Sequence, residues 1–123
     1  MSEPRRSASS IELNDRAKWR RWLERNHAKK AGVWLVTYKK SAGKPRIDLE
    51  AAVDEAVCFG WIDSKVKAVD DERTSYYFTP RRPKSSWTEG NHARFERLES
   101  AGLMTDAGRA CYPGRHGEHK ALP

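Results

Sequence analysis

The chain has 123 residues, a length typical of one domain and sufficient for a core without metal or disulfide staples. Its net charge of +7 favours polyanionic partners, namely nucleic acid, anionic lipid or phosphorylated ligands, or serves solubility alone. The longest apolar run, Val33 to Val36, is too short to cross a bilayer, and the polar N-terminus does not read as a signal peptide. Two distant cysteines, Cys58 and Cys111, form no disulfide framework, so we expect a reduced, cytoplasmic location.

One domain is predicted, with a polar segment at each end. Residues 1–12 begin with serine, arginine and proline and are predicted to be a disordered lead-in. Residues 13–112 hold the periodic apolar patterns and are predicted to form the domain. Residues 113–123 are predicted to be a polar tail.

A helix, a strand and a second helix are predicted in the first half of the chain. Asn14 or Asp15 can cap the first helix, in which tryptophan and leucine recur at helical spacing between basic residues. Residues 33–38 are rich in β-branched and aromatic side chains, which predicts a buried strand. Asp48 is expected to cap a helix with one apolar face, and Gly60 to end it.

The second half predicts a hairpin followed by two helices. Residues 61–69 alternate in polarity and residues 75–79 are rich in aromatic side chains, so we expect an antiparallel pair. Pro80 is expected to end the second of these strands or to place it at an edge of the sheet. Residues 86–89 have the Ser-x-x-Glu pattern of a capping box, and Thr105 is expected to cap a short last helix.

The predicted order is therefore α-β-α-β-β-α-α, an α+β fold. We expect three mainly antiparallel strands with helices packed on one face of the sheet. The helix between the first two predicted strands leaves room for a parallel pair, so the sheet could also be mixed.

The most unusual segment is 79–87, which places Arg81, Arg82 and Lys84 among prolines just before a helix. Proline stiffens the loop, and arginine forks match phosphate or carboxylate oxygens. The following helix N-terminus adds free amides, and Trp87 adds a stacking face. The pattern predicts an anion site. The alternative is a structural loop whose arginines pair with acids elsewhere in the chain, Asp54, Glu55, Asp70 or Asp71.

Three other residues have a functional and a structural interpretation. Asp63 follows an apolar stretch and could be a base, but an ion pair with Arg81 or Arg82 is the favoured interpretation. Cys58 could be a nucleophile, but a small buried core residue is favoured. Lys39 ends a strand and could join the anion site or protect an edge.

No cofactor or metal is predicted. Cys111, His116 and His119 have a spacing that fits no zinc signature. The sequence contains no P-loop, dinucleotide glycine pattern, nucleophile elbow or named nucleic-acid module.

Four blocks within about residues 16–110 resemble the YdeI/OmpD-associated (bacteriocin-protection) family. The blocks are Gly32–Leu35 with Tyr38–Lys40, Glu55–Asp63, Phe78–Ser85 with Trp87, Asn91 and Arg94, and Gly102–Thr105 with Ala107–Gly108. The resemblance implies a small bacterial α+β domain linked to protection against bacteriocins and antimicrobial peptides and to an outer-membrane porin, with no established reaction. The signature residues that map onto this chain are Phe59, Gly60, Trp61, Asp63, Arg81, Arg82, Lys84 and Trp87.

Three functions are carried forward as hypotheses. The first is a non-enzymatic protection or stress protein that binds an unknown anionic ligand or protein partner. Its expected ligand-binding residues are Lys39, Trp61, Asp63, Arg81, Arg82, Lys84 and Trp87. The second is a nucleic-acid-binding module, which the mixture of basic and aromatic residues favours. The third is an unrecognised enzyme that uses Asp63 or Cys58. A homodimer is left open in each case.

Overall fold

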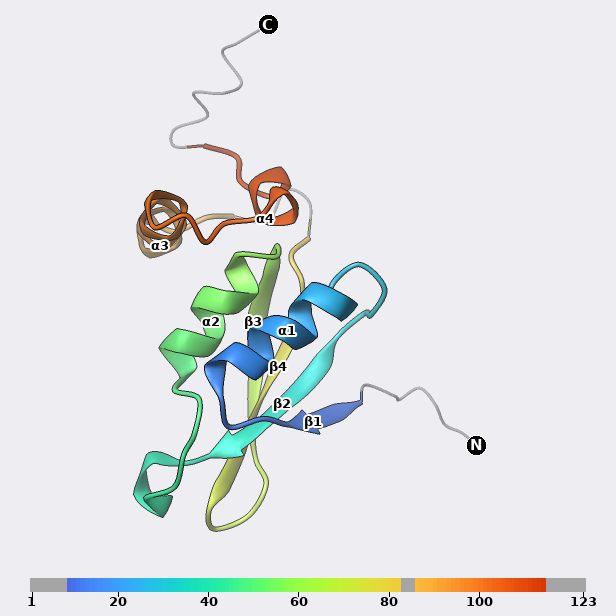
Figure 1. Cartoon of the computed structure of the whole chain (residues 1–123), viewed down its shortest axis with the longest axis vertical. Helices are drawn as coiled ribbons and strands as arrows, with labels where there is room; N and C mark the ends of the chain where they lie inside the picture. Colours follow the sequence, from blue (N-terminus) through green and yellow to red (C-terminus); the bar gives the residue numbers. More distant parts are fainter. Residues whose placement is uncertain (1–8, 83–85, 115–123) are drawn as a thin grey trace, which may run out of the picture.

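The computed structural model of the chain describes residues 9–82 and 86–114 (Figure 1). The fold is α+β, as predicted, and consists of a mixed four-stranded sheet with helices. In chain order the elements are β1 (Ser10–Glu12), α1 (Arg16–Asn26), β2 (Val33–Tyr38), the 3-10 helix η2 (Lys40–Ala42), α2 (Leu49–Val57), β3 (Trp61–Ala68), β4 (Arg73–Pro80), α3 (Glu89–Ser100) and α4 (Asp106–Ala110).

The sheet order is β1-β2-β4-β3, with β1 parallel to β2 and the other pairs antiparallel. The predicted hairpin of β3 and β4 is confirmed, but the prediction of three strands, and with it the predicted element order α-β-α-β-β-α-α, is wrong. The additional strand, Ser10–Glu12, lies inside the predicted disordered lead-in. It escaped prediction because three residues, of which only Ile11 is apolar, are too few to show an alternating pattern.

The two long helices of the first half begin at their expected caps. Asp15, rather than Asn14, caps α1, because its carboxylate accepts hydrogen bonds from the first-turn amides. Asn14 instead accepts a hydrogen bond from the hydroxyl of Thr37 at 2.7 Å, which ties the start of α1 to β2. The carboxylate of Asp48 accepts from the amide of Ala51 and caps α2 as predicted.

The capping box at residues 86–89 does not form. Thr88 is the N-cap of α3, and its hydroxyl accepts a hydrogen bond from the amide of Asn91 at 3.1 Å. A threonine two residues after the predicted serine therefore supplies the capping oxygen. The expected glycine after this helix, Gly102, is confirmed by its φ of +77°, and Thr105 caps α4 as predicted.

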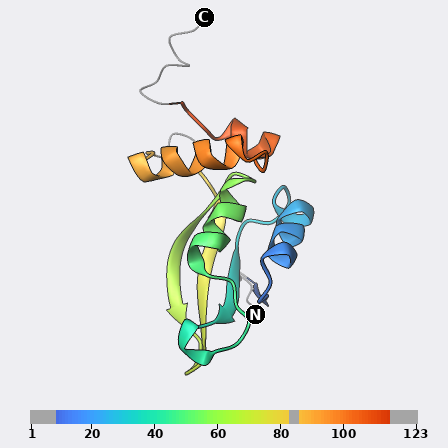
Figure 2. The same cartoon turned by 60° about the vertical axis from the view of Figure 1, so that its left-hand side comes forward.

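Helices α1 and α2 cover the same face of the sheet (Figure 1). When the molecule is turned by 60°, both helices remain on one side of the strands (Figure 2). In both views α3 and α4 lie beyond one end of the sheet. The opposite face of the sheet is therefore covered by none of the described helices.

The core lies between the sheet and the pair α1 and α2. Trp19 and Leu23 of α1 are fully buried against Leu35 and Phe78 of the central strands. Trp61 is 1% exposed, and its indole Nε1 donates a hydrogen bond to the backbone oxygen of His27. None of the described helices combines the length and the apolar character needed to span a membrane.

Candidate functional site

In the predicted cationic loop, the described part is folded onto itself. The guanidinium carbon of Arg81 lies 4.1 Å from the centre of the Trp87 ring, and its Nη2 donates to the backbone oxygen of Ser86 at 2.8 Å. Burial lowers the pKa of Arg81, and its Nε is buried without a hydrogen-bond partner among the described residues. Arg82 is exposed, and Lys84 lies outside the described residues. Trp87 thus provides a stacking face as predicted, but the group that stacks on it is Arg81 of the same loop.

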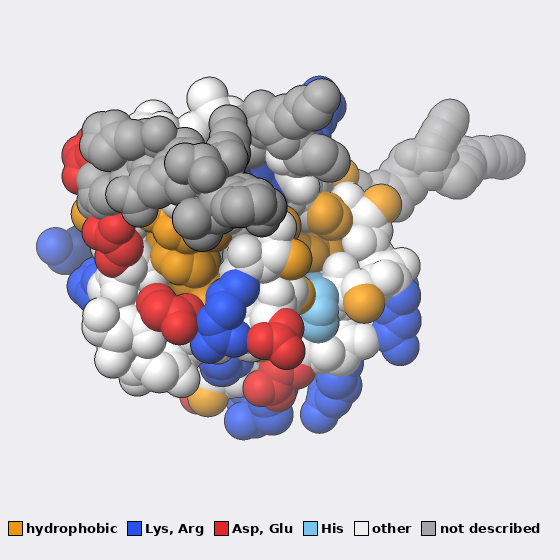
Figure 3. Space-filling model, turned by 90° about the horizontal axis from the view of Figure 1, so that it is seen from above, with side chains coloured by type: hydrophobic (Ala, Val, Ile, Leu, Met, Phe, Trp, Pro, Cys, Tyr) orange, Lys and Arg blue, Asp and Glu red, His pale blue; other side chains and the backbone are white. Residues whose placement is uncertain are grey.

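The ion pairs predicted for this loop are not formed by its described residues. Asp54 pairs with Arg94 and Arg97 of α3, and Glu55 pairs with two arginines of α1. Asp63 likewise forms no ion pair with Arg81 or Arg82. It lines a hollow together with Leu49 and Tyr76, whereas the guanidinium of Arg81 lies over Trp87. Figure 3 views the molecule from the end that carries α3 and α4. Acidic and basic side chains lie next to one another on the described surface there, so that surface is not one cationic patch.

The structure does not bring together the six predicted site residues that it describes. Lys39 follows the end of β2 that pairs with the start of β4, whereas Arg81 follows the end of β4, so the two cations lie at opposite ends of the sheet. Trp61 is a core residue next to Trp22, whereas Trp87 packs on Phe95 and other rings of the α3–α4 end.

Cys58 has the surroundings of a core residue, which confirms the favoured interpretation. Its side chain is fully buried, and this burial raises the pKa of the thiol, although Arg20 opposes the shift. A raised pKa disfavours the thiolate that a nucleophile requires. His116 and His119, considered with Cys111 as metal ligands, lie outside the described residues, and the described part of the chain contains no metal-binding group of acids, cysteines or histidines.

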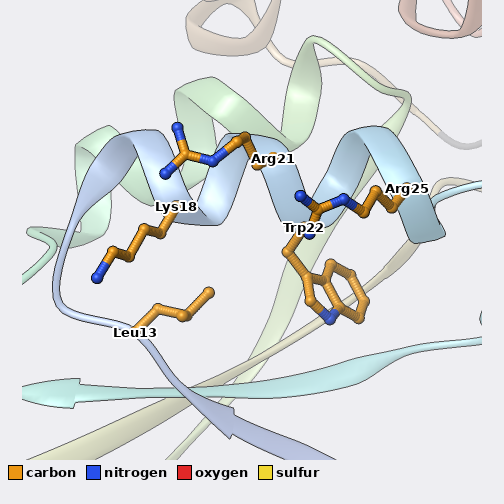
Figure 4. Close-up of a pocket in the computed structure, with 5 residues that line it drawn as sticks. All are labelled: Leu13, Lys18, Arg21, Trp22 and Arg25. Carbon is orange, nitrogen blue, oxygen red and sulfur yellow. The ribbon is translucent and has the colours of Figure 1, made fainter.

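A second set of cations surrounds a pocket of about 310 Å³ beside α1 (Figure 4). We call this the α1 pocket; its lining residues are Leu13, Lys18, Arg21, Trp22 and Arg25. The three cations lie on α1 at positions i, i+3 and i+7, which places them on one face of the helix.

The apolar wall of the α1 pocket is fixed to the core. The Trp22 ring stacks on that of Trp19 at a centroid distance of 5.5 Å and an interplanar angle of 15°. It also meets the edge of Trp61 at 5.8 Å. The backbone amide of Leu13 donates to the oxygen of Val36 in β2 at 3.1 Å. A ligand in the pocket would therefore meet an indole that is already positioned.

The cations of the α1 pocket have no acidic partner among the described residues. By contrast, Arg16 and Arg20, on the neighbouring face of α1, both pair with Glu55. Like charges one helical turn apart destabilise a helix by about 0.2–0.5 kcal/mol per pair. An anion bound between them would offset that repulsion.

The interpretation of the sequence missed the α1 pocket, although the spacing of Lys18, Arg21, Trp22 and Arg25 is visible in the sequence.

Comparison with known proteins identifies a family without a described activity. The model of a domain of unknown function, DUF8412, matches residues 11–111. That range contains the whole α1 pocket and every described helix. No curated protein and no solved structure matches the chain.

Proposed function

We propose that this chain, which belongs to the DUF8412 family of domains of unknown function, is a binding protein rather than an enzyme. The ligand is a small molecule that carries a phosphate group and a flat apolar group, and it binds in the α1 pocket. The observation that carries the proposal is that three cations without acidic partners among the described residues line one pocket together with an indole.

The cations define the charged part of the ligand. The planar fork of arginine matches two phosphate oxygens at once, and two such forks, Arg21 and Arg25, lie one turn apart on α1. Lys18 adds a point charge on the same helix face. All three side chains are exposed at the pocket, so they reach a ligand without first breaking an ion pair to a described residue.

The indole and Leu13 define the other part of the ligand. Trp22 is half-buried, and its position is fixed by Trp19 and Trp61. An aromatic or apolar group that covers this wall would add dispersion and stacking contacts to the charge pairing. A nucleoside monophosphate combines the two features, and we use adenosine monophosphate as the probe.

The test is an NMR titration that follows the indole N–H signals and the backbone amides of α1. Adenosine monophosphate is expected to shift the signals of Trp22 and its neighbours in a saturable way. Inorganic phosphate is expected to bind more weakly, because it lacks the flat group, and adenosine more weakly still, because it lacks the charge. If adenosine and its monophosphate titrate alike, the cations play no part and the proposal fails.

A pair of variants separates the site from net charge. The change Arg21→Gln with Arg25→Gln should weaken monophosphate binding at least about tenfold, the effect of about 1.4 kcal/mol. Lys29→Gln with Lys30→Gln removes the same charge from two exposed residues just after α1 and should leave binding within about twofold. Equal losses in the two double variants would show a general charge effect and refute the α1 pocket as the site.

The protective role implied by the resemblance to YdeI/OmpD-associated proteins remains a prediction that rests on that resemblance. It can be checked by expressing the chain in a bacteriocin-sensitive bacterium and measuring survival. If protection depends on ligand binding, the Arg21→Gln/Arg25→Gln variant should protect less than the wild type. Equal survival with and without the expressed chain would contradict the protective role.

A further inference from the structure

The sheet face that no described helix covers carries a pair of aromatic rings at its centre. Trp34 of β2 and Tyr77 of β4 are directly opposite each other in the strand register. Their ring centroids are 4.9 Å apart, with planes inclined at 36°. Both side chains are half-buried, so each ring keeps a part of its surface exposed on this face.

The backbone of Gly32 makes room for one of these rings. A Cβ at residue 32 would lie 2.6 Å from the hydroxyl oxygen of Tyr77 and 2.9 Å from its Cζ. The phenol ring of Tyr77 therefore packs against the backbone of Gly32 and beside the indole of Trp34. The two rings form a supported aromatic surface rather than two loose side chains.

Two lysines from the edge strand β3 reach over this surface. The Nζ of Lys65 lies 5.3 Å from the centre of the Tyr77 ring, and that of Lys67 lies 5.4 Å from the centre of the Trp34 ring. Both lysines are exposed, and neither pairs with an acid in the part of the chain that the structure describes. A cation–π contact at an exposed site contributes only about 0.5–1 kcal/mol, so the ammonium groups are easily displaced.

We infer that this face binds single-stranded nucleic acid, with bases stacking on Trp34 and Tyr77 and the ammonium groups of Lys65 and Lys67 contacting phosphates. A base that stacks on an aromatic side chain contributes about 1–3 kcal/mol, which exceeds the cation–π contact it displaces. The released ammonium, on a flexible stem of four carbons, then turns to the phosphate of the same strand. An acidic peptide would satisfy the lysines but would offer no flat ring for each aromatic side chain.

This site differs from the α1 pocket, which lies on the helix-covered side of the sheet. The inference therefore does not depend on the proposed function. A nucleotide in the α1 pocket and a single strand on the open face would respond to different substitutions.

The test is the fluorescence anisotropy of a short fluorescein-labelled oligothymidylate, titrated with the full chain at low and at moderate salt. We expect binding that weakens steeply with salt. Lys65→Gln with Lys67→Gln should weaken it and should reduce the slope of log affinity against log salt by roughly 0.7 for each lysine that no longer neutralises a phosphate. Trp34→Leu should weaken binding about fivefold to a hundredfold, the effect of removing one stacked base.

Controls separate this site from fold, charge and the other pocket. Thermal unfolding shows whether Trp34→Leu lowers stability. Because Lys65 and Lys67 are exposed, their double variant tests the inference even if it does. Lys29→Gln with Lys30→Gln should bind like the wild type. Loss of binding in Arg21→Gln/Arg25→Gln but not in the sheet variants would place the strand at α1 and overturn the inference. Binding to anionic phosphatidylglycerol vesicles without binding to the oligonucleotide would overturn it as well.

Discussion

Asp54 of α2 and Arg94 of α3 form an ion pair in which the side chain of Asp54 is 9% exposed and that of Arg94 is 18% exposed. A second guanidinium, that of Arg97, donates to the same carboxylate oxygen at 2.9 Å. Arg94 also donates to the backbone oxygen of Glu50, at the start of α2. This charged cluster links the end of the molecule that holds α3 to the layer that holds the α1 pocket.

The first prediction is that Asp54→Ala lowers the free energy of unfolding by about 3 kcal/mol. Removing one member of a buried pair leaves a desolvated charge behind, although Glu50 still compensates Arg94 in part. Urea unfolding followed by circular dichroism measures the change. Arg97→Ala is the control, with a loss below about 1 kcal/mol, because its side chain is 59% exposed. Equal losses in the two variants would contradict this description of the cluster.

The second prediction concerns acid. Burial of Asp54 opposes its ionisation, but the hydrogen bonds from Arg97 and Arg94 outweigh burial and lower the pKa of the carboxyl. A group whose pKa is lower in the folded state contributes stability above its unfolded value of about 3.9 and loses it as the pH falls through the folded value. We therefore expect the free energy of unfolding to decrease as the pH is lowered below about 4. In Asp54→Asn this fall should be shallower, and an unchanged pH profile would contradict the assignment.

The third prediction concerns the two thiols. Cys58 is fully buried with a raised pKa, whereas Cys111 is half-buried. An aromatic disulfide reagent should therefore modify Cys111 first in the native protein and Cys58 only as fast as the fold opens. The variant Cys111→Ser isolates Cys58 for this measurement. A fast native reaction of Cys58 would revive the hypothesis of a nucleophile at this position.

The fourth prediction concerns the turn between α2 and β3. Gly60 has a φ of +79°, and a Cβ there would lie 2.9 Å from the Sγ of Cys111 and 3.0 Å from the backbone oxygen of Ala107. Gly60→Ala should therefore cost about 2–4 kcal/mol of unfolding free energy, from the left-handed backbone and from the clash with α4.

Gly43 provides the matched control for that substitution. Its φ is +67°, but a Cβ at this position would meet no atom within 4 Å. Gly43→Ala should therefore cost only the backbone contribution, about 1 kcal/mol. If the two alanine variants unfold at the same denaturant concentration, the close approach of α4 to residue 60 contributes nothing.

Much of the fold was predictable because its elements carry local patterns. Residues 33–38 are rich in β-branched and aromatic side chains, and β2 has these same bounds. The caps Asp48 and Thr105 were recognised because a short polar side chain precedes each helix, and the first cap was narrowed to Asn14 or Asp15 for the same reason. The strand order was not predictable, since the pairing of β2 with β4 joins residues far apart in the chain and no local pattern encodes it.

The candidate site was harder to predict than the fold. Arg81 and Arg82 stood out because prolines frame them, yet the ring that Arg81 meets belongs to its own loop. Lys39 was predicted to join Arg81 in the anion site or to protect a sheet edge, but which end of a sheet a residue occupies depends on strand direction. Conversely, Trp34 and Tyr77 read as strand residues without a function. Only the register places them side by side on the face opposite the helices.

The register of β3 against β4 is interrupted between Asp63 and Lys65. Because β3 is an edge strand, this irregularity breaks the row of backbone donors and acceptors that a further strand would need. The lysines along the same edge would repel an identical copy. The interrupted register and the edge lysines therefore disfavour strand addition at β3, whether by many copies in a fibril or by one copy in a homodimer.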